Sequence, residues 1–294
     1  MSIPRAVLFR LATSTRWERI AKTVPQGQAA AWRAASRYVA GTSAADAARV
    51  ARELHARGAG ASIDHFGELV TDPAVVRQVA DDYLGLAGGL AGFPDDTWLS
   101  VDLSHLGLDV DPSDCADRLA AIARALPPGG RVQVGAEDHA RADGVLACVL
   151  DVAGRGLADR LCATAQANLR RTPDDAERLL AAGVAIRLVK GAYVESREVA
   201  LPFGEPTDVA YLRLAHRLAQ VGDGAPVMLA THDGVLREAL LAALGPLPVE
   251  QLLGVRPEVV DDLVARGVPV RVYVPFGDDW FRYWMRRVAE ARGA

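Results

Sequence analysis

Two segments of the chain combine apolar, β-prone residues with cationic and phenolic side chains. The first, residues 187–193, reads Arg-Leu-Val-Lys-Gly-Ala-Tyr, and the second covers residues 273–287. In the second segment Tyr283, Arg286 and Arg287 are spaced i, i+3 and i+4, which places them on one face of a helix. Two guanidinium groups beside a phenol suit the binding of a small carboxylate or phosphate.

Short apolar runs that alternate with amphipathic stretches are the elements that must position these side chains. Eight strand–helix units over about 230 residues predict an α/β fold, a closed (β/α)8 barrel of the TIM type. An open doubly wound sheet is the alternative, although no G-x-G-x-x-G fingerprint follows the first strand candidate. The strand candidates are residues 61–64, 98–104, 131–136, 161–165, 185–190, 226–231, 250–255 and 269–275, and the helix candidates between them include residues 114–125, 173–182, 209–219, 236–244 and 257–266.

The N-terminal part of the chain differs from the rest in its sequence pattern. We expect residues 1–58 to form a helical extension and residues 59–294 to form the barrel domain. Within the extension, residues 29–57 are rich in alanine, and Ser43 is placed to cap a helix. Residues 3–24 mix apolar and basic side chains, which is typical of an amphipathic helix that packs on the domain or touches a membrane surface.

The composition indicates an ordinary globular protein and excludes several other classes. Of the 294 residues 50% are hydrophobic and 24% are charged, and the net charge of -4 argues against a basic nucleic-acid-binding protein. Three widely spaced cysteines without metal-ligand spacing argue against a disulfide framework or a zinc site, and favour a reducing, cytoplasmic compartment. No apolar run reaches the roughly 18 residues that a transmembrane helix needs.

Polar residues at the ends of the strand candidates have two interpretations each. An unpaired buried cation is costly, so Arg187 and Lys190 either face a ligand or form structural ion pairs. Residues 231–233, Thr-His-Asp, either bind a ligand or cap the next helix. Asp64 and Glu68 flank a glycine, and capping of a helix is the simpler interpretation of that pair.

Several motifs occur in the same order, over nearly the whole chain, as in a known family. On these motifs the chain resembles the proline dehydrogenase family. The segments that carry the resemblance are Ile-Asp-His-Phe-Gly-Glu at 63–68, the segment at 187–193, Ala-Thr-His-Asp at 230–233, Gly-Val-Arg-Pro-Glu at 254–258, Tyr-Val-Pro-Phe-Gly-x-x-Trp at 273–280 and Tyr-x-x-Arg-Arg at 283–287.

The resemblance implies a distorted (β/α)8 barrel that holds FAD non-covalently. It further implies oxidation of L-proline to 1-pyrroline-5-carboxylate in proline catabolism, with hydride passing from the substrate ring carbon next to nitrogen to flavin N5. The electrons would go to a quinone, so a protein of this kind is expected in the cytoplasm, with possible peripheral contact to the inner face of the membrane. The barrel domain would then bind both cofactor and substrate.

The resemblance also implies roles for individual residues. Arg187 would lie near the flavin ring, where a cation stabilises the negative charge of the reduced flavin. Two arginines, Arg286 and Arg287, would clamp the substrate carboxylate. The two tyrosines, Tyr273 and Tyr283, would wall the substrate ring. The other implied cofactor-binding residues are Gln166 at the isoalloxazine edge, Lys190, Gly191 and Tyr193, and then Thr231 and His232 at the ribityl, phosphate or adenine portion.

Two positions depart from the family pattern together. Where the family has a lysine that assists the carboxylate clamp, this chain has Asp102, and where it has the lysine's aspartate partner, this chain has Gly135. A leucine, Leu253, also replaces an aromatic residue that the family often has. An anion about 4 Å from a substrate carboxylate costs on the order of 4 kcal/mol at an effective dielectric of 20. We therefore expect Asp102 to lie in the substrate site and free proline to bind less well.

The departures leave three functions open. The protein is a proline dehydrogenase with a rearranged clamp, or a flavin-dependent dehydrogenase of another cyclic or secondary amine whose carboxylate is masked, or a non-catalytic flavin-binding relative. A barrel enzyme that binds phosphate or metal is a further alternative, because Arg187 and Lys190 are basic strand ends. No carboxylate or histidine cluster has clear metal-ligand spacing, so we expect no metal.

Overall fold

The computed structural model describes residues 31–220 and 227–291, and a closed barrel of parallel strands forms its centre. Each strand pairs with the next in chain order, and β1 pairs with β8. The predicted (β/α)8 barrel is thus confirmed. The strands are β1 (Gly60–His65), β2 (Thr97–Val101), β3 (Val132–Val134), β4 (Leu161–Gln166), β5 (Ala185–Val189), β6 (Val227–Ala230), β7 (Val249–Leu252) and β8 (Val270–Phe276).

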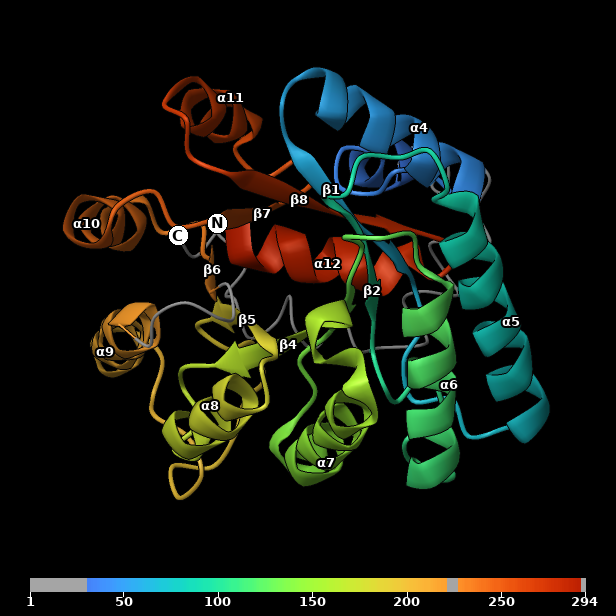
Figure 1. The fold of residues 1–294 in the computed structure, drawn as a ribbon. Helices are drawn as coiled ribbons and strands as arrows, with labels where there is room; N and C mark the ends of the chain where they lie inside the picture. Colours follow the sequence, from blue (N-terminus) through green and yellow to red (C-terminus); the bar gives the residue numbers. More distant parts are fainter. Residues whose placement is uncertain (1–30, 221–226, 292–294) are drawn as a thin grey trace.

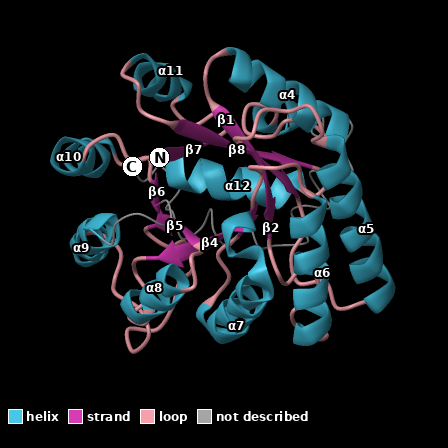
Figure 2. Ribbon diagram, viewed as in Figure 1, coloured by secondary structure: helices cyan, strands magenta, loops and turns pink. Residues whose placement is uncertain are grey.

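Helices surround the barrel, and one further helix lies across its middle. Figure 1 shows α12 inside the ring that the other helices form, and Figure 2 shows the same separation of strands and helices. All the helix candidates between the strands are present, although α5 and α7 were not among them. The helices are α4 (Ala44–Ala56), α5 (Pro73–Gly89), α6 (Pro112–Ala125), α7 (Ala142–Val152), α8 (Thr172–Ala181), α9 (Glu205–Gln220), α10 (Gly234–Leu244), α11 (Pro257–Ala265) and α12 (Trp280–Ala291).

The start of α4 is fixed by the predicted cap. The hydroxyl of Ser43 accepts a hydrogen bond from the amide of Asp46, and the Asp46 carboxylate accepts one from the amide of Ser43. This reciprocal pair satisfies two amides that the first helical turn leaves without partners. The basic segment predicted at residues 3–24 lies outside the described residues, so the limits of the N-terminal extension stay a prediction.

A small second core holds α12 in place. Ala35 and Val39, which precede α4, pack with Trp280, Phe281 and Tyr283 of α12. The rings of Trp280 and Phe281 meet edge to face, with centroids 5.9 Å apart. Because this core joins the segment before α4 to α12, it fixes the helix over the C-terminal ends of the strands, where barrel enzymes carry their chemistry.

The main core lies between the strands and the surrounding helices. Large side chains such as Ile63, Leu99, Leu161 and Ile186 are fully or almost fully buried there. Burying one such side chain stabilises the fold by about 1.5–3 kcal/mol. Within the described parts of the chain, no helix is both long enough and apolar enough to span a bilayer. The same residues contain no cluster of three side chains that could ligate a metal ion.

Candidate active site

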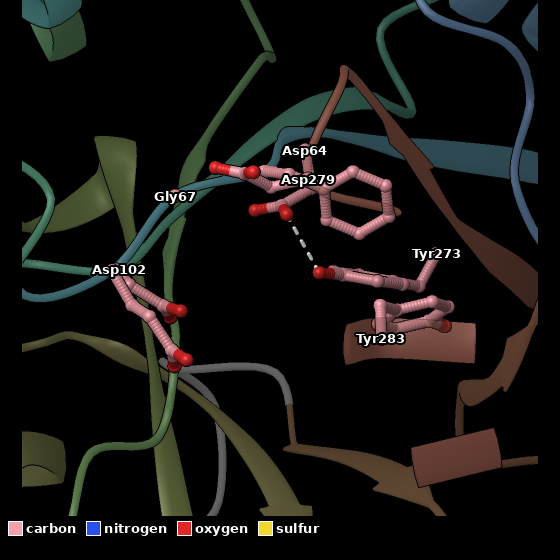
Figure 3. Close-up of a pocket in the computed structure, with 8 residues that line it drawn as sticks. Asp64, Gly67, Asp102, Tyr273, Asp279 and Tyr283 are labelled. Carbon is pink, nitrogen blue, oxygen red and sulfur yellow. Dashed lines mark hydrogen bonds between the residues drawn. The ribbon is translucent and has the colours of Figure 1, made fainter. Parts of the chain in front are cut away.

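A pocket opens at the C-terminal ends of β1, β2 and β8, next to α12. It holds about 520 Å³ of empty space, some of it open to solvent. Figure 3 shows Tyr273 and Tyr283 on one side of the opening and Asp102 on the other. The position agrees with the rule that barrel sites are built from strand ends. The lining residues are Asp64, Phe66, Gly67, Glu68, Asp102, Tyr273, Asp279 and Tyr283.

Tyr273 of β8 is anchored to Asp64 of β1. Its hydroxyl donates a hydrogen bond of 2.7 Å to the Asp64 carboxylate, and Figure 3 marks this contact. Burial, together with the negative charge of Asp64, raises the pKa of Tyr273 well above its usual value, so the phenol stays protonated. The interpretation of Asp64 as a helix cap is wrong: β1 continues to His65, and α5 begins later with Asp72 as its cap.

The second tyrosine reaches the pocket from α12. The Tyr283 ring lies 6.2 Å from the Tyr273 ring and 5.1 Å from the Phe66 ring, measured between centroids. The Arg287 guanidinium carbon lies 4.9 Å from the centre of the Tyr283 ring, within cation–π range. Thus the structure places Tyr273 and Arg287 each beside Tyr283, whereas the side chain of Arg286 lies outside the described residues.

The two departures from the family pattern meet in space. Asp102 directly follows β2, and Gly135 directly follows β3, where its amide donates a 2.9 Å hydrogen bond to the carbonyl of Val101. A Cβ atom added to Gly135 would overlap Oδ1 of Asp102. The Asp102 carboxylate therefore occupies the space that a side chain at position 135 would need, and the two departures are sterically linked.

The pocket is acidic among its described lining residues. Four of the eight are carboxylates, Asp64, Glu68, Asp102 and Asp279, and none of the eight is a lysine or arginine. Three of these carboxylates, Asp64, Glu68 and Asp102, make interactions with other groups. The lining therefore differs from that of a site that binds a substrate carboxylate through lysine or arginine alone. An anionic substrate group must here enter beside negatively charged side chains.

The predicted cofactor residues gather at the ends of the neighbouring strands β4, β5 and β6. Gln166 at the end of β4 is buried, and its side-chain amide donates a 2.8 Å hydrogen bond to the carbonyl of Glu137. Thr231 follows β6 and is also buried. His232 Nε2 accepts a 3.2 Å hydrogen bond from the amide of Leu252, and burial lowers the pKa of His232 to about 4. His232 is therefore neutral near neutral pH.

Lys190 joins two helices at this edge of the barrel. Its ammonium group lies 2.6 Å from a carboxylate oxygen of Asp208 in α9 and 2.8 Å from one of Asp233, which caps α10. Burial works to lower the pKa of Lys190, but these two carboxylates outweigh it and the pKa is raised. The interpretation of Asp233 as a helix cap is confirmed. For Lys190 the two alternatives were a ligand-facing side chain and a structural ion pair, and the structure shows the ion pairs.

The chain after β5 crosses toward the end of β3. Gly191 has φ 110°, and a Cβ atom there would overlap the side chain of Asn168, so only glycine fits without rearrangement. Two residues later, the Tyr193 hydroxyl donates a 2.9 Å hydrogen bond to the carbonyl of Ala136. This segment therefore links the cofactor residues predicted on β5 to the strand end that carries Gly135.

Arg187 of β5 points into the barrel and is paired with Glu250 of β7. The Glu250 side chain is 0% exposed and that of Arg187 is 14% exposed. Burial opposes the charge of Arg187, but the ion pair outweighs it and the pKa of Arg187 is raised. The sequence interpretation missed Glu250 and Asp208 as partners. The sequence did contain an indication for Glu250, which is a charged residue at the start of an apolar strand candidate. A charged side chain that is buried in such a strand needs a partner.

Comparison with known proteins places the chain in a family. The family model described as proline dehydrogenase matches residues 47–294. A proline dehydrogenase of Deinococcus radiodurans is 33% identical, with 96% of this chain and 94% of the relative covered. Proline dehydrogenase 1 of Bacillus subtilis (strain 168) is 32% identical, with 87% of this chain and 86% of the relative covered.

Solved structures share the fold at lower identity. Proline utilization A from Bdellovibrio bacteriovorus, in a form inactivated by N-propargylglycine, has a TM-score of 0.80 and 19% identity, and the match covers 97% of this chain. A mutant of the Bradyrhizobium japonicum protein has a TM-score of 0.74, 22% identity and 94% coverage. The matched region spans only 36% and 33% of those longer proteins, so they support the fold alone. The two homologues with matched length and the family model show that this chain belongs to the proline dehydrogenase family of oxidoreductases.

Proposed function

We propose that the protein oxidises L-proline to 1-pyrroline-5-carboxylate with FAD as its cofactor. The observation that carries the proposal is that Tyr273 and Tyr283 line a pocket over the strand ends, with Arg287 stacked on the Tyr283 ring. A wall of two aromatic rings suits a small saturated ring, and a guanidinium suits its carboxylate. The family membership of the chain supports the same reaction.

The residues at the ends of β4, β5 and β6 fit a flavin by the chemistry of their polar groups. An amide (Gln166), a hydroxyl (Thr231) and a neutral imidazole (His232) can hydrogen-bond the ring edge, the ribityl chain and the adenine portion. Lys190, Gly191 and Tyr193 complete the proposed set. FAD supplies the hydride acceptor when it is bound, and the protein supplies position and charge.

The chain's own residues would orient the substrate for that transfer. Arg286 and Arg287 would bind the carboxylate, while Tyr273 and Tyr283 would exclude water and hold the ring. Tyr273 is fixed by its hydrogen bond to Asp64, so its ring offers one defined surface. Holding the reacting carbon in one geometry replaces an encounter between free partners and supplies a large part of the rate enhancement.

A second substrate class is favoured by Asp102. Its carboxylate lines the same pocket as Asp64, Glu68 and Asp279. An ester, amide or thioester of proline, or another cyclic secondary amine, carries no carboxylate to be repelled by these groups. We propose such an amine as the alternative substrate of the same reaction.

The proposal also includes the electron acceptor and the location of the protein in the cell. The family resemblance supports a quinone as acceptor, a cytoplasmic protein and peripheral contact with the inner face of the membrane. Sedimentation with vesicles made from anionic lipid, with and without residues 1–30, tests the membrane contact. Vesicle binding by the full chain that is lost on truncation agrees with it, and absence of vesicle binding by the full chain contradicts it.

A dye-linked assay tests the substrate directly. Purified protein loaded with FAD is given L-proline or L-prolinamide with a soluble electron acceptor, and the product mass is measured. A product of L-proline that has lost two hydrogens agrees with the main proposal. Turnover of the amide alone moves the assignment to the carboxylate-masked class, and turnover of neither contradicts both.

A further inference from the structure

The barrel interior contains a layer of polar side chains beneath the pocket. Ser62 of β1, Gln133 of β3, Arg187 of β5 and Glu250 of β7 all point inward and meet at the Glu250 carboxylate. Alternate strands of a TIM-type barrel contribute such layers of four, but bulky aliphatic residues usually fill them. Here the residues in the layer are polar, and an ion pair lies at its centre.

The contacts of Glu250 are directional. One carboxylate oxygen accepts from Arg187 Nε and, at 3.3 Å, from the side-chain amide of Gln133. The other accepts from the Ser62 hydroxyl, also at 3.3 Å. Ser62, Gln133 and Glu250 are at most 2% exposed, whereas the Arg187 side chain reaches 14% exposure. Glu250 is therefore the fully buried end of the pair, and Arg187 is the more exposed end.

A second layer closes the barrel on the side away from the pocket. Trp98 of β2, Cys162 of β4 and Met228 of β6 form a buried cluster there. Arg271 of β8 joins them, with its guanidinium carbon 3.3 Å from the centre of the Trp98 ring. This packing leaves the Glu250 carboxylate enclosed on that side.

Stability alone does not account for the ion pair. A buried pair costs so much desolvation that well-packed apolar residues of similar volume are often equally or more stable. Arg187 also lies near the candidate site, since Tyr273 contributes to raising the pKa of Arg187. The pair therefore fits a role in setting the charge and orientation of Arg187 at that site.

We infer that Glu250 is a positioning residue that orients Arg187 and balances its charge, so that the two act on the bound flavin as a neutral pair. This inference rests on the proposed function, which places Arg187 near the flavin ring. A lone buried arginine would favour the reduced, anionic flavin strongly. Because the Glu250 carboxylate offsets the charge of Arg187, only part of the preference for reduced flavin remains.

The affinities of the protein for oxidised and reduced FAD, measured anaerobically, test the inference. In Glu250→Gln the carboxylate charge is lost, and the preference for reduced over oxidised FAD should rise by about tenfold or more. For a two-electron couple, tenfold corresponds to a potential about 30 mV more positive. The matched control is Glu238→Gln, a glutamate of α10 that pairs with Arg237 and Arg266, which should leave the preference unchanged. A folded, flavin-loaded Glu250→Gln protein with the wild-type preference overturns the inference.

The double variant Arg187→Gln/Glu250→Gln covers the case in which the single variant does not fold or bind FAD. Because both charges of a neutral pair are removed, its preference should stay within about threefold of wild type. A preference for reduced FAD that falls by more than about tenfold overturns the inference, because Arg187 then acts as a lone cation.

A thermal melt without flavin separates this inference from the proposed function. Glu250→Gln should melt below wild type, because it leaves a buried guanidinium unpaired, and the double variant should recover more than half of that loss. A double variant that melts no higher than Glu250→Gln contradicts the pairing. Wild-type protein that binds no FAD contradicts the proposed function instead, whatever the melts show.

Discussion

The two halves of the barrel mouth differ in how closely they follow the family pattern. At the ends of β4, β5 and β6, residues 187–193 and 230–233 keep the family motifs, and Lys190, Asp208 and Asp233 form one connected set of ion pairs. At the ends of β2 and β3, Asp102 and Gly135 stand where the resemblance to the family leads us to expect a lysine and an aspartate. We call these the cofactor half and the substrate half. The difference agrees with the proposal of a retained flavin site beside a changed substrate contact.

The steric link between Asp102 and Gly135 explains why the change involves both positions. A side chain at position 135 would overlap the Asp102 carboxylate, so a return to the family pattern at only one position meets a clash or leaves a charge unpaired. The overlap links the two positions and agrees with the proposal that the requirement on the pocket has changed.

The largest effect is expected from restoring the family pair in the substrate half. Asp102→Lys with Gly135→Asp removes an anion near the substrate carboxylate and adds a cation. If the charge term is about 4 kcal/mol, kcat/KM for L-proline should rise by up to several hundredfold, mainly through KM. Steady-state kinetics with L-proline measure the change.

Two controls sharpen this prediction. Asp95→Lys makes the same charge change as Asp102→Lys, but Asp95 lies in the loop before β2 at the other end of the barrel, so it should leave KM unchanged. Gly135→Asp alone should be less stable than the double variant because of its overlap with Asp102. A double variant that gains no activity on L-proline shows that the departures do not set the substrate.

Acid should destabilise both halves through buried histidines. Burial lowers the pKa of His105, beneath Gly67 in the substrate half, and of His232 in the cofactor half, each to about 4. Unfolded histidine titrates near 6.5, so between about pH 6.5 and pH 4 the unfolded state binds more protons and stability falls as the pH falls. Each histidine should contribute a loss of up to about 3 kcal/mol over that window.

Urea unfolding at about pH 7 and about pH 4.5 measures the loss. In His105→Asn the pH dependence should shrink, while the contribution of His232 should remain. If the free energy of unfolding does not change with pH over this range, the two imidazoles are not buried in their neutral form.

A smaller effect is expected at the helix cap of the cofactor half. Asp233 caps α10 through the amides of Val235 and Leu236, and it also pairs with Lys190. Asp233→Ala should lower the free energy of unfolding by about 2 kcal/mol, because it loses the cap and a charge-assisted hydrogen bond. Chemical denaturation measures this loss. A cost no larger than that of an ordinary cap would show that the Lys190 pair contributes nothing to stability.

The smallest effect is expected at the corresponding cap on the other side. Asp72 caps α5 through the amide of Ala74. Asp72→Ala should cost about 1 kcal/mol by the same denaturation measurement. If this variant costs as much as Asp233→Ala, the two halves do not differ in how their helix ends are held.

The fold was largely predictable because each strand is a short apolar run bounded by turn residues. All eight predicted strands are present, but β2 ends at Val101 and β3 at Val134, earlier than the runs indicated. Helix α5 was not predicted because its C-terminal part contains Gly85, Gly88 and Gly89, which weaken a helical pattern. Helix α7 is apolar on most sides, so it lacks the polar face that marks an amphipathic helix.

The site was predictable where a motif is local and not where partners come from distant strands. Tyr283 and Arg287 lie on one helix, so their spacing alone placed them together. The contact of Asp64 with Tyr273 joins β1 to β8, and that of Arg187 with Glu250 joins β5 to β7. Neither is visible in the sequence, because only closure of the barrel brings these strands face to face.

The most direct test of the proposed flavin site follows the flavin itself. Protein reconstituted with FAD is kept without oxygen, and its flavin absorbance is recorded as L-proline is added. We expect a bound flavin that is bleached by L-proline, with half-saturation lowered by the Asp102→Lys/Gly135→Asp change. A protein that binds no flavin would contradict the claim that the cofactor half is intact.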